Sequence, residues 1–351
     1  MPIFAHPEFD QHEQVVFCHD QATGLKAIVA IHDTRLGPAL GGCRVWPYAD
    51  EQQALNDVLR LSRGMTYKSA LAGLPLGGGK AVIIADPRKD KTPELFQAMG
   101  AFVDRLGGRY ITAADSGTGV TEMAQIRQRT RHVVGAGERE AFGGGLRTGD
   151  PSPSTALGVF IGLREAVRQR LGGRDLNGLK VAIQGVGQVG FDLARQLHAA
   201  GAELWVSDID AGNLQRARDQ LGAQVVSQDA IHGLDVDVFS PCALGAVIND
   251  QTLQVLRTPV IAGAANNQLA RPGHAEELWR RGQLHAPDYA INAGGVIDVA
   301  YEYSGGSPEQ VRLHVEGIGE TLRQIFQRAE AEGRNTTAIA DSLALERLNA
   351  A

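Results

Sequence analysis

The sequence predicts an α/β protein of two domains, and three observations support this fold class. The length of 351 residues is typical of two domains and allows a large buried core. In the second half of the chain, short apolar segments alternate with segments of helical periodicity, which predicts a parallel sheet with helices on both faces. Between Lys180 and Gly190, a strand, a glycine-rich turn and a helix follow one another, which predicts a dinucleotide-binding unit.

The predicted dinucleotide-binding unit contains three glycines in the spacing G-x-G-x-x-G: Gly185, Gly187 and Gly190. In this spacing the first glycine permits a tight turn, the second lets a pyrophosphate approach the backbone, and the third lets the helix pack on the strand. The next predicted strand, Glu203–Ser207, is followed by Asp208. A carboxylate at that point accepts hydrogen bonds from ribose hydroxyls and repels a 2′-phosphate, which favours NAD over NADP.

Composition and charge exclude several classes of function. A net charge of −6, without runs of lysine or arginine, argues against a nucleic-acid partner. We find neither a signal peptide nor an apolar segment long enough to cross a membrane, so we expect a cytoplasmic protein. The three cysteines lie far apart, which suits a reducing compartment. Because the histidines and cysteines lack the spacing of metal ligands, we also expect no metal site.

The first half of the chain alternates predicted strands and helices of its own. Apolar segments predict strands at Leu25–Ile31, Ala81–Ala85 and Arg109–Thr112. Helical spacing predicts helices over Asp50–Arg63, with Asp50 as the cap, and over Pro93–Leu106. This region is therefore expected to form an α/β domain separate from the dinucleotide-binding unit.

The domain boundaries follow from the polar segment Glu138–Pro153, whose glycines and prolines predict a connection. We place a catalytic and oligomerisation domain at residues 1–150 and the dinucleotide-binding domain at residues 151–329. A C-terminal segment, from about residue 330 to residue 351, is expected to return to the first domain. We expect the last strand of the second domain at Tyr289–Asn292, and apolar residues at helical spacing predict one long helix over Val311–Ile325.

Three charged residues of the first domain suggest a reaction on an α-amino or α-keto acid. Lys68 and Lys80 lie beside glycines at the edges of predicted elements, and Asp115 follows a predicted strand in a turn rich in glycine, serine and threonine. One lysine can bind a substrate carboxylate, and the other can exchange protons if it lies in a desolvated pocket. Each residue alone is more often a surface charge or a turn former, so the combination carries the hypothesis.

Segments distributed over nearly the whole chain resemble, in the same order, the family of glutamate, leucine, valine and phenylalanine dehydrogenases. The length and the segment Asp86–Lys91 are most similar to the leucine branch of that family. The segments that carry the resemblance are Leu36–Arg44, Gly64–Lys68, Leu76–Lys80, Asp115–Thr118, Gly185–Gly190, Ala262–Gln268 and Ile291–Val296.

This resemblance implies a reversible, NAD-dependent oxidative deamination of an L-amino acid to its 2-keto acid and ammonia, carried out by a homo-oligomer of two to eight subunits. It implies an N-terminal α/β catalytic domain, a doubly wound Rossmann NAD-binding domain, and an active site in the cleft between them. By motif, Lys80 corresponds to the catalytic lysine that activates water, and Lys68 to the lysine that binds the substrate carboxylate. Asp115 corresponds to the carboxylate that shuttles protons and stabilises the imine and ammonium species. Further substrate contacts are implied for Leu40, Gly41, Met65, Ala113, Asn267, Val296 and Val299. Cofactor contacts are implied for Thr155, Gly185, Gly187, Gln188, Val189, Gly190, Asp208 and Asn292.

Two classes of substrate side chain stay open. The positions that shape the side-chain pocket in the family are apolar here, and an uncharged, desolvated pocket rejects a carboxylate. This favours leucine, valine or isoleucine. The segment Ala264–Asn267 and the glycine run Gly143–Gly145 are instead similar to the phenylalanine branch, so phenylalanine or tryptophan is the alternative. Asp298, which lies between two of the pocket valines, is expected to point away from the pocket.

Two other functions compete with the dehydrogenase hypothesis. A non-catalytic NAD-binding module would keep the glycine loop and Asp208, but it would not need Lys68, Lys80 and Asp115 together. A NAD-dependent hydroxy-acid dehydrogenase usually has an Arg/His pair in its cleft, and we find no such pair in the sequence. A Lys80→Ala variant separates these functions, because only the amino-acid dehydrogenase needs this lysine for turnover.

Overall fold

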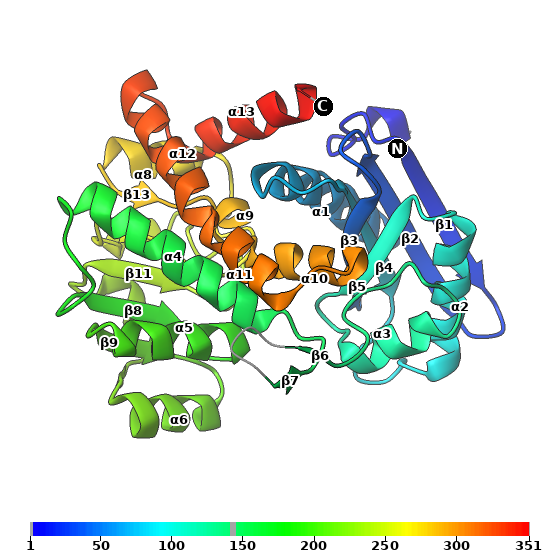
Figure 1. The fold of residues 1–351 in the computed structure, drawn as a ribbon, viewed down its shortest axis with the longest axis horizontal. Coiled ribbons are helices and arrows are strands. Elements are labelled where there is room, and N and C mark those ends of the chain that lie inside the picture. Colours follow the sequence, from blue (N-terminus) through cyan, green and yellow to red (C-terminus); the bar gives the residue numbers. More distant parts are fainter. Residues whose placement is uncertain (1–2, 141–144, 351) are drawn as a thin grey trace. The chain divides into compact units, whose positions relative to one another are not determined.

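The computed structural model describes residues 3–140 and 145–350, and packing divides the chain into two compact units (Figure 1). The first unit contains Met1–Asp150, Asp298–Val311 and Ala344–Ala351, and the second contains Pro151–Ile297 and Arg312–Leu343. The chain therefore returns to the first unit twice, whereas the sequence led us to expect a single return near residue 330. The helix that contains Asp298 begins in the second unit and ends in the first, which a linear pattern does not show.

The first unit is built on a mixed five-stranded sheet with the order β1-β2-β4-β3-β5. β1 and β2 are antiparallel, as are β2 and β4, whereas β3 runs parallel to both β4 and β5. β4 includes the glycines before the expected strand Ala81–Ala85, so the glycine run lies within the sheet. The strands are β1 (Gln14–Asp20), β2 (Leu25–Asp33), β3 (Ala39–Trp46), β4 (Gly77–Ile84) and β5 (Tyr110–Ala114).

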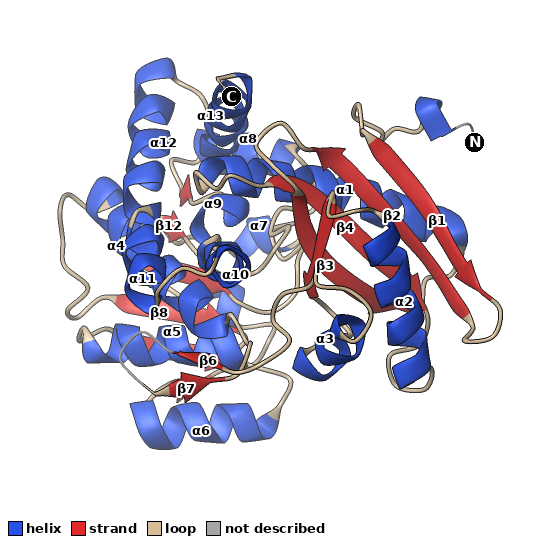
Figure 2. Cartoon of the chain, turned by 45° about the vertical axis from the view of Figure 1, so that its right-hand side comes forward, coloured by secondary structure: helices blue, strands red, loops and turns tan. Residues whose placement is uncertain are grey.

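Helices cover both faces of this sheet (Figure 2). α1 (Glu51–Leu71) covers one face, and α2 (Pro93–Arg105) and α3 (Val120–Arg127) cover the other. The carboxylate of Asp50 accepts a hydrogen bond from the backbone N–H of Gln53, so Asp50 caps α1 as predicted. The unit also contains the short 3-10 helix η1 (Ile3–Ala5) and the antiparallel pair β6 (Arg139–Glu140) and β7 (Leu146–Arg147).

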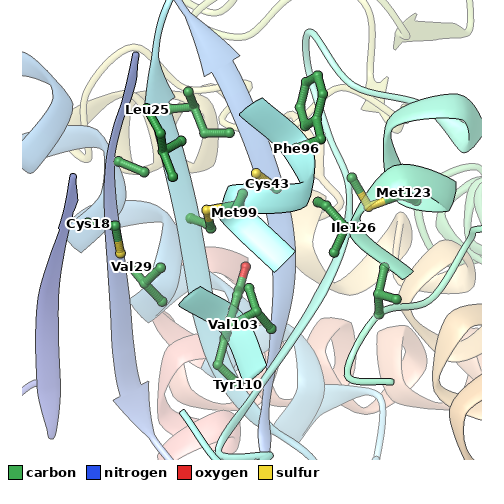
Figure 3. Close-up of a cluster of buried hydrophobic side chains, with 14 of the residues drawn as sticks. Cys18, Leu25, Val29, Cys43, Phe96, Met99, Val103, Tyr110, Met123 and Ile126 are labelled. Atoms are coloured by element: carbon green, nitrogen blue, oxygen red, sulfur yellow. The ribbon is translucent and has the colours of Figure 1, made fainter. Parts of the chain in front are cut away.

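Side chains of the central strand β4 alternate between these two faces. Ala81 and Ile83 pack in the hydrophobic cluster that contains Phe96 and Met99 of α2, part of which Figure 3 shows. Val82 instead packs against apolar residues of α1. Since alternate residues of a strand share a face, Lys80 lies on the face that α1 covers.

The second unit has a parallel six-stranded sheet with the order β10-β9-β8-β11-β12-β13. Numbered from β8, this is the order 3-2-1-4-5-6 of a doubly wound Rossmann-type sheet, which confirms the predicted fold class. The strands are β8 (Lys180–Gln184), β9 (Glu203–Ser207), β10 (Gln224–Val225), β11 (Val238–Pro241), β12 (Val260–Ile261) and β13 (Leu284–His285).

The remaining helices include three that cross the division between the units. Within the described part of the chain, no helix is both long enough and apolar enough to cross a bilayer. The helices of the second unit are α4 (Ser152–Arg170), α5 (Gln188–Ala199), α6 (Ala211–Leu221), η2 (Ile231–Gly233), α7 (Thr252–Val255), α8 (Gly273–Arg280), α9 (Asp288–Ile291) and α12 (Ile318–Glu332). Those that cross are α10 (Gly294–Ser304), α11 (Pro308–Glu316) and α13 (Thr336–Asn349).

Two of the predicted elements are wrong. The segment Tyr289–Asn292 belongs to the helical turn α9 and its cap, and the sixth strand is β13, which lies just before it in the sequence. The expected single helix over Val311–Ile325 is two helices, because at Gly317 the backbone N–H bonds to the carbonyl of His314 and the chain tightens into a turn. Glycine weakens a helix interior, which explains the break.

Candidate functional site

The first unit brings Lys80 and Asp115 together as a largely buried ion pair. The Nζ atom of Lys80 lies 2.7 Å from Oδ2 of Asp115, and the two side chains are 8% and 16% exposed. The Nε atom of Arg44 donates to the same oxygen at 3.1 Å. Burial alone would raise the pKa of Asp115, but the charges of Lys80 and Arg44 outweigh it and lower this pKa to about 2. Asp115 is therefore a carboxylate at neutral pH.

Strand register explains how these residues meet. β3 lies between β4 and β5, and Leu40, Gly42 and Arg44 alternate onto the face that carries Lys80. Gly42 pairs with Ala113 of β5, two residues before Asp115. A Cβ atom at Gly42 would lie 2.6 Å from Cβ of Asp115 and 3.2 Å from Nζ of Lys80. The ion pair therefore depends on a glycine at position 42.

Gly41, the glycine that we assigned to substrate binding, points toward the opposite face. Its carbonyl accepts a hydrogen bond of 2.7 Å from the hydroxyl of Tyr110, which belongs to the hydrophobic cluster beneath α2. A Cβ atom at Gly41 would lie 1.7 Å from the carbonyl oxygen of Gly79, so the position also serves close packing of β3 on β4. Substrate contact at Gly41 stays a prediction, and Gly42 is the glycine at which a side chain would collide with the ion pair.

Arg44 connects the ion pair to a second carboxylate that we did not select from the sequence. Its Nη1 atom lies 2.8 Å from Oδ2 of Asp57 in α1, and the hydroxyl of Tyr48 donates to the same oxygen at 2.7 Å. Arg60 approaches Oδ1 of Asp57 at 3.3 Å. The sequence did hold a signal for the role of Arg44. Alternate residues of a strand share a face, so Arg44 lies on the same face as Leu40 and Gly42.

Lys68 lies on α1, the helix that covers the face with the ion pair. Helical spacing places Asp57, Leu61, Gly64 and Lys68 on one stripe of this helix. Lys68 and its neighbour Met65 are half-buried. A Cβ atom at Gly64 would meet no described atom within 4 Å, so there is open space beside this residue of the stripe.

The predicted pocket residues Leu40 and Ala113 share the face of Lys80. Both side chains are buried, and Gly78, which pairs with Leu40, packs against Thr66 of α1. They therefore form apolar surface beside the charged groups. Val299, in the part of α10 that belongs to the first unit, is also buried.

The three glycines of the predicted dinucleotide-binding motif differ in what an added side chain would meet. Gly185 has a φ of +93°, and a Cβ atom there would lie 2.7 Å from Cβ of Ala243. At Gly190 a Cβ atom would lie 2.0 Å from the carbonyl oxygen of Gly185, so this residue lets α5 pack on β8. Gly187 has an ordinary φ of −67°, and a Cβ atom there would meet no described atom within 4 Å. Close packing therefore does not require a glycine at position 187, and the space beside this residue is open.

Asp208 lies at the carboxyl end of β9, next to this loop. Its Oδ2 atom accepts a hydrogen bond from the backbone N–H of Val186, and its Oδ1 atom accepts one from that of Asp210, both at 2.8 Å. Ile209 and Leu244, which follow β9 and β11, are 88% and 82% exposed. Apolar side chains at the carboxyl edge of such a sheet suit the flat base of a nucleotide, and nothing in the linear pattern marks these two residues as exposed.

Asn292 and Thr155 lie at another point of the second unit, beside the start of α10. The Nδ2 atom of Asn292 donates to the carbonyl of Ala264 at 3.0 Å and to Oδ1 of Asn266 at 2.8 Å, which fixes the orientation of the amide. Its Oδ1 atom is buried and accepts no hydrogen bond from a described residue, so it could accept one from a bound amide. A Cβ atom at Gly295 would lie 2.6 Å from Oγ1 of Thr155.

The other predicted cofactor residues, Gln188 and Val189, open α5, where Gln188 is exposed and Val189 half-buried. Asn267 is exposed, with a φ of +52°. Its backbone N–H donates to Oδ2 of Asp288 at 2.6 Å, and its carbonyl accepts from the N–H of Ala246 at 2.7 Å. Val296 is buried at the start of α10.

Asp298 is fully buried on α10. It lines a hollow of about 410 Å³ in the first unit together with Tyr301, Glu140 and Glu302, and neither Val296 nor Val299 belongs to this lining. The glycine run that pointed to the phenylalanine branch lies largely outside the described residues. Among the described residues, no group of three or more His, Cys, Asp or Glu side chains could hold a metal ion.

Comparison with known proteins confirms the resemblance that the motifs indicated. Residues 12–132 match the family described as Glu/Leu/Phe/Val dehydrogenase, dimerisation domain, and residues 206–351 match the family described as Glutamate/Leucine/Phenylalanine/Valine dehydrogenase. A leucine dehydrogenase of Thermoactinomyces intermedius is 49% identical over 99% of this chain and 94% of its own length. A phenylalanine dehydrogenase of Bacillus thermotolerans is 46% identical over 98% of this chain and 90% of its own.

A solved structure is similarly close. The crystal structure of L-tryptophan dehydrogenase from Nostoc punctiforme superimposes with a TM-score of 0.82 and is 46% identical, covering 97% of this chain and 96% of that protein. The leucine, phenylalanine and tryptophan enzymes are thus nearly equidistant in sequence. The comparisons show the reaction family and do not separate these side chains.

Proposed function

Because the chain belongs to the glutamate, leucine, phenylalanine and valine dehydrogenase family and is an amino-acid dehydrogenase, we propose that it catalyses the NAD-dependent, reversible oxidative deamination of an apolar L-amino acid. The observation that carries this proposal is the buried pair of Lys80 and Asp115, with Lys68 on the helix that covers the same face. In the proposed reaction the amino acid, NAD⁺ and water give the 2-keto acid, ammonium, NADH and a proton.

Each charged side chain of the first unit has a separate role in this proposal. Lys68 binds the substrate carboxylate as a point charge. Once it has released its own proton, Lys80 accepts a proton from the water that attacks the imine carbon, and returns it as ammonia leaves. Asp115 was expected both to shuttle protons and to stabilise the imine and ammonium species, and its low pKa favours the second role, that of a fixed negative charge. A bound nicotinamide supplies the acceptor for the hydride from Cα.

The residues of the second unit support NAD as the cofactor. Gly187 leaves the space that a pyrophosphate needs, and the buried Oδ1 atom of Asn292 can accept a hydrogen bond from a carboxamide. Asp208 supports NAD over NADP, because its carboxylate can bind ribose hydroxyls and would repel a 2′-phosphate. Thr155, Gln188 and Val189 complete the proposed contacts.

For the substrate side chain we propose leucine, valine or isoleucine, with phenylalanine or tryptophan as the alternative. Leu40 and Ala113 are apolar and buried on the face of the ion pair, which disfavours a charged side chain. Met65, Val296, Val299, Gly41 and Asn267 are the other proposed substrate contacts. The near-equal identity to the leucine, phenylalanine and tryptophan enzymes keeps the aromatic alternative in place.

We further propose a cytoplasmic homo-oligomer. The matched description of residues 12–132 as a dimerisation domain supports self-association through the first unit. Light scattering of the purified chain tests this point, and a monomer at micromolar concentration would contradict it.

The test of the proposed function is the initial rate of NAD⁺ reduction at alkaline pH with leucine, valine, isoleucine, phenylalanine, tryptophan and glutamate, repeated with NADP⁺. We expect the highest kcat/KM with a branched-chain amino acid and NAD⁺. A preference for phenylalanine or tryptophan would keep the chemistry and replace the proposed substrate by the alternative. No turnover with any of them would contradict the proposed function.

A further inference from the structure

The carboxylate of Asp115 is held by two cations at one oxygen. Nζ of Lys80 and Nε of Arg44 contact Oδ2 at 2.7 and 3.1 Å. Both of these contacts are made at Oδ2, and a hydrogen bond from the backbone N–H of Ser116 also helps to lower the pKa of this carboxyl group. Two charged contacts at one oxygen fix the orientation of the carboxylate. Because each carboxylate oxygen has two lone pairs, Oδ1 can still accept a hydrogen bond from a further cationic or N–H partner.

Arg44 is itself fixed from its other side. Its Nη1 atom bonds to Oδ2 of Asp57, which also accepts the hydroxyl of Tyr48. The side chains of Arg44 and Asp57 are only 19% and 15% exposed. A planar guanidinium that bridges two carboxylates has little freedom to turn, so Asp57 and Tyr48 determine where the Nε atom points.

These groups supply the charges around Asp115. Arg60 adds an exposed contact to Asp57. Cys43 and Tyr110 also lie near Asp115, and burial raises the pKa of the thiol to about 12 and the pKa of the phenol well above its usual value. Both are neutral at working pH. Lys80 and Arg44 therefore balance the two carboxylates, Asp115 and Asp57.

We propose that Arg44 is a positioning residue of this enzyme: held by Asp57 and Tyr48, it occupies Oδ2 of Asp115 and thereby reserves Oδ1 for the reacting nitrogen of the substrate. The inference rests on the proposed function, since it assumes an amine that becomes an iminium. It assigns Asp57, on the covering helix, and Tyr48, before that helix, a role in turnover through Arg44 alone. None of the three needs to touch the substrate.

The test compares kcat and KM for Arg44→Met, Arg44→Lys, Asp57→Asn and Tyr48→Phe. Because a misplaced reacting group can lower a rate by about 100-fold, we expect Arg44→Met to lower kcat by about that factor while KM for the amino acid changes little. Arg44→Lys keeps the charge but cannot bridge both carboxylates, so we expect its kcat to lie between those of Arg44→Met and the unmodified chain. Tyr48→Phe removes a single hydrogen bond and should lower kcat by about threefold.

The decisive variant combines Arg44→Met with Asp57→Asn. If Asp57 acts through Arg44, the double variant has the kcat of Arg44→Met, whereas independent roles would multiply the two losses. Arg35→Met is the matched control, because it removes another arginine–aspartate pair of the same unit, with Nη2 of Arg35 2.6 Å from Oδ2 of Asp33. We expect its kcat to stay within about twofold of the unmodified chain.

Three results would overturn the inference. They are a folded Arg44→Met variant with an unchanged kcat, multiplicative losses in the double variant, or an equal loss in Arg35→Met. If Arg44→Met fails to fold, Tyr48→Phe and Arg44→Lys provide the same test. The inference then requires that they lower kcat and leave KM for the amino acid nearly unchanged. Absence of turnover in the unmodified chain would instead contradict the proposed function, so the two failures are distinguishable.

Discussion

The two units arrange their polar groups in opposite ways. In the first unit, Lys80, Asp115, Arg44 and Asp57 contact one another and balance their charges. In the second unit, Gly187 borders open space, and Oδ1 of Asn292 is buried without a described hydrogen-bond partner. A site for proton transfer can satisfy its groups internally, whereas a site for a cofactor must leave space and hydrogen-bonding capacity for it. The comparison predicts that substitutions in the two units have different consequences.

The largest expected effect comes from Lys80→Ala. Loss of a general base lowers kcat by about 10²- to 10⁴-fold, while the affinity for NAD⁺ should stay unchanged because the proposed cofactor residues belong to the other unit. Steady-state kinetics and calorimetric titration of NAD⁺ measure the two quantities. Lys26→Ala, at an exposed position of β2, is the matched control. Normal turnover of Lys80→Ala would contradict the lysine mechanism.

Acid should destabilise both units through one buried histidine in each. Burial lowers the pKa of His32 and of His285 to about 4. Between pH 6.5 and 4 the unfolded chain binds protons that these folded sites do not, so the free energy of unfolding falls with pH by about 3 kcal/mol for each histidine.

Denaturant unfolding at a series of pH values measures this loss. His32→Gln and His285→Gln should each flatten the dependence between these pH values, whereas His198→Gln, at an exposed position, should not. Equal slopes for all three variants would contradict the assignment of the acid sensitivity to the buried rings.

Gly42→Ala tests the close packing of the first unit. The added Cβ atom would lie 2.6 Å from Cβ of Asp115, so the strand or the ion pair must shift. We expect a loss of about 1–3 kcal/mol in the free energy of unfolding, together with a loss of kcat. Chemical denaturation and kinetics check both quantities, and an unchanged kcat would show that the ion pair tolerates displacement.

Gly187→Ala tests the open space of the second unit and should have the smallest effect. The φ of this residue is negative, at −67°, and an added Cβ atom would meet no atom of the described chain within 4 Å. We therefore expect unchanged stability and about tenfold weaker NAD⁺ binding, equivalent to about 1.4 kcal/mol. A loss of stability with intact NAD⁺ binding would assign this glycine to the fold instead.

The sequence predicted the second unit well because its signals are local. Strand β8, the glycine turn, helix α5 and Asp208 follow one another along the chain, and each glycine has a recognisable physical role. Prediction was wrong where a short apolar segment was ambiguous. Tyr289–Asn292 suits a strand by composition, but Pro287 and Asp288 begin a helical turn there. At Gly317, the apolar residues keep their helical spacing although one helix ends and the next begins there.

The sequence predicted the site of the first unit less completely because its contacts are long-range. Lys80 and Asp115 could be selected by residue type and motif, whereas the bridge from Arg44 to Asp57 requires knowing which face of β3 meets α1. The choice between Gly41 and Gly42 shows the same difficulty, since a shift of one residue reverses the face of a strand. Register between β3, β4 and β5 is a property of the folded sheet.

The measurement that tests the central claim most directly is the stoichiometry of the reaction with L-leucine and NAD⁺. NADH by absorbance, ammonium by a coupled assay and the 2-keto acid by chromatography are followed in one reaction mixture. Oxidative deamination predicts equal amounts of the three products at every time point, and none of them with Lys80→Ala beyond its residual rate. NADH formation without ammonium, or no product from any apolar L-amino acid, would contradict the account.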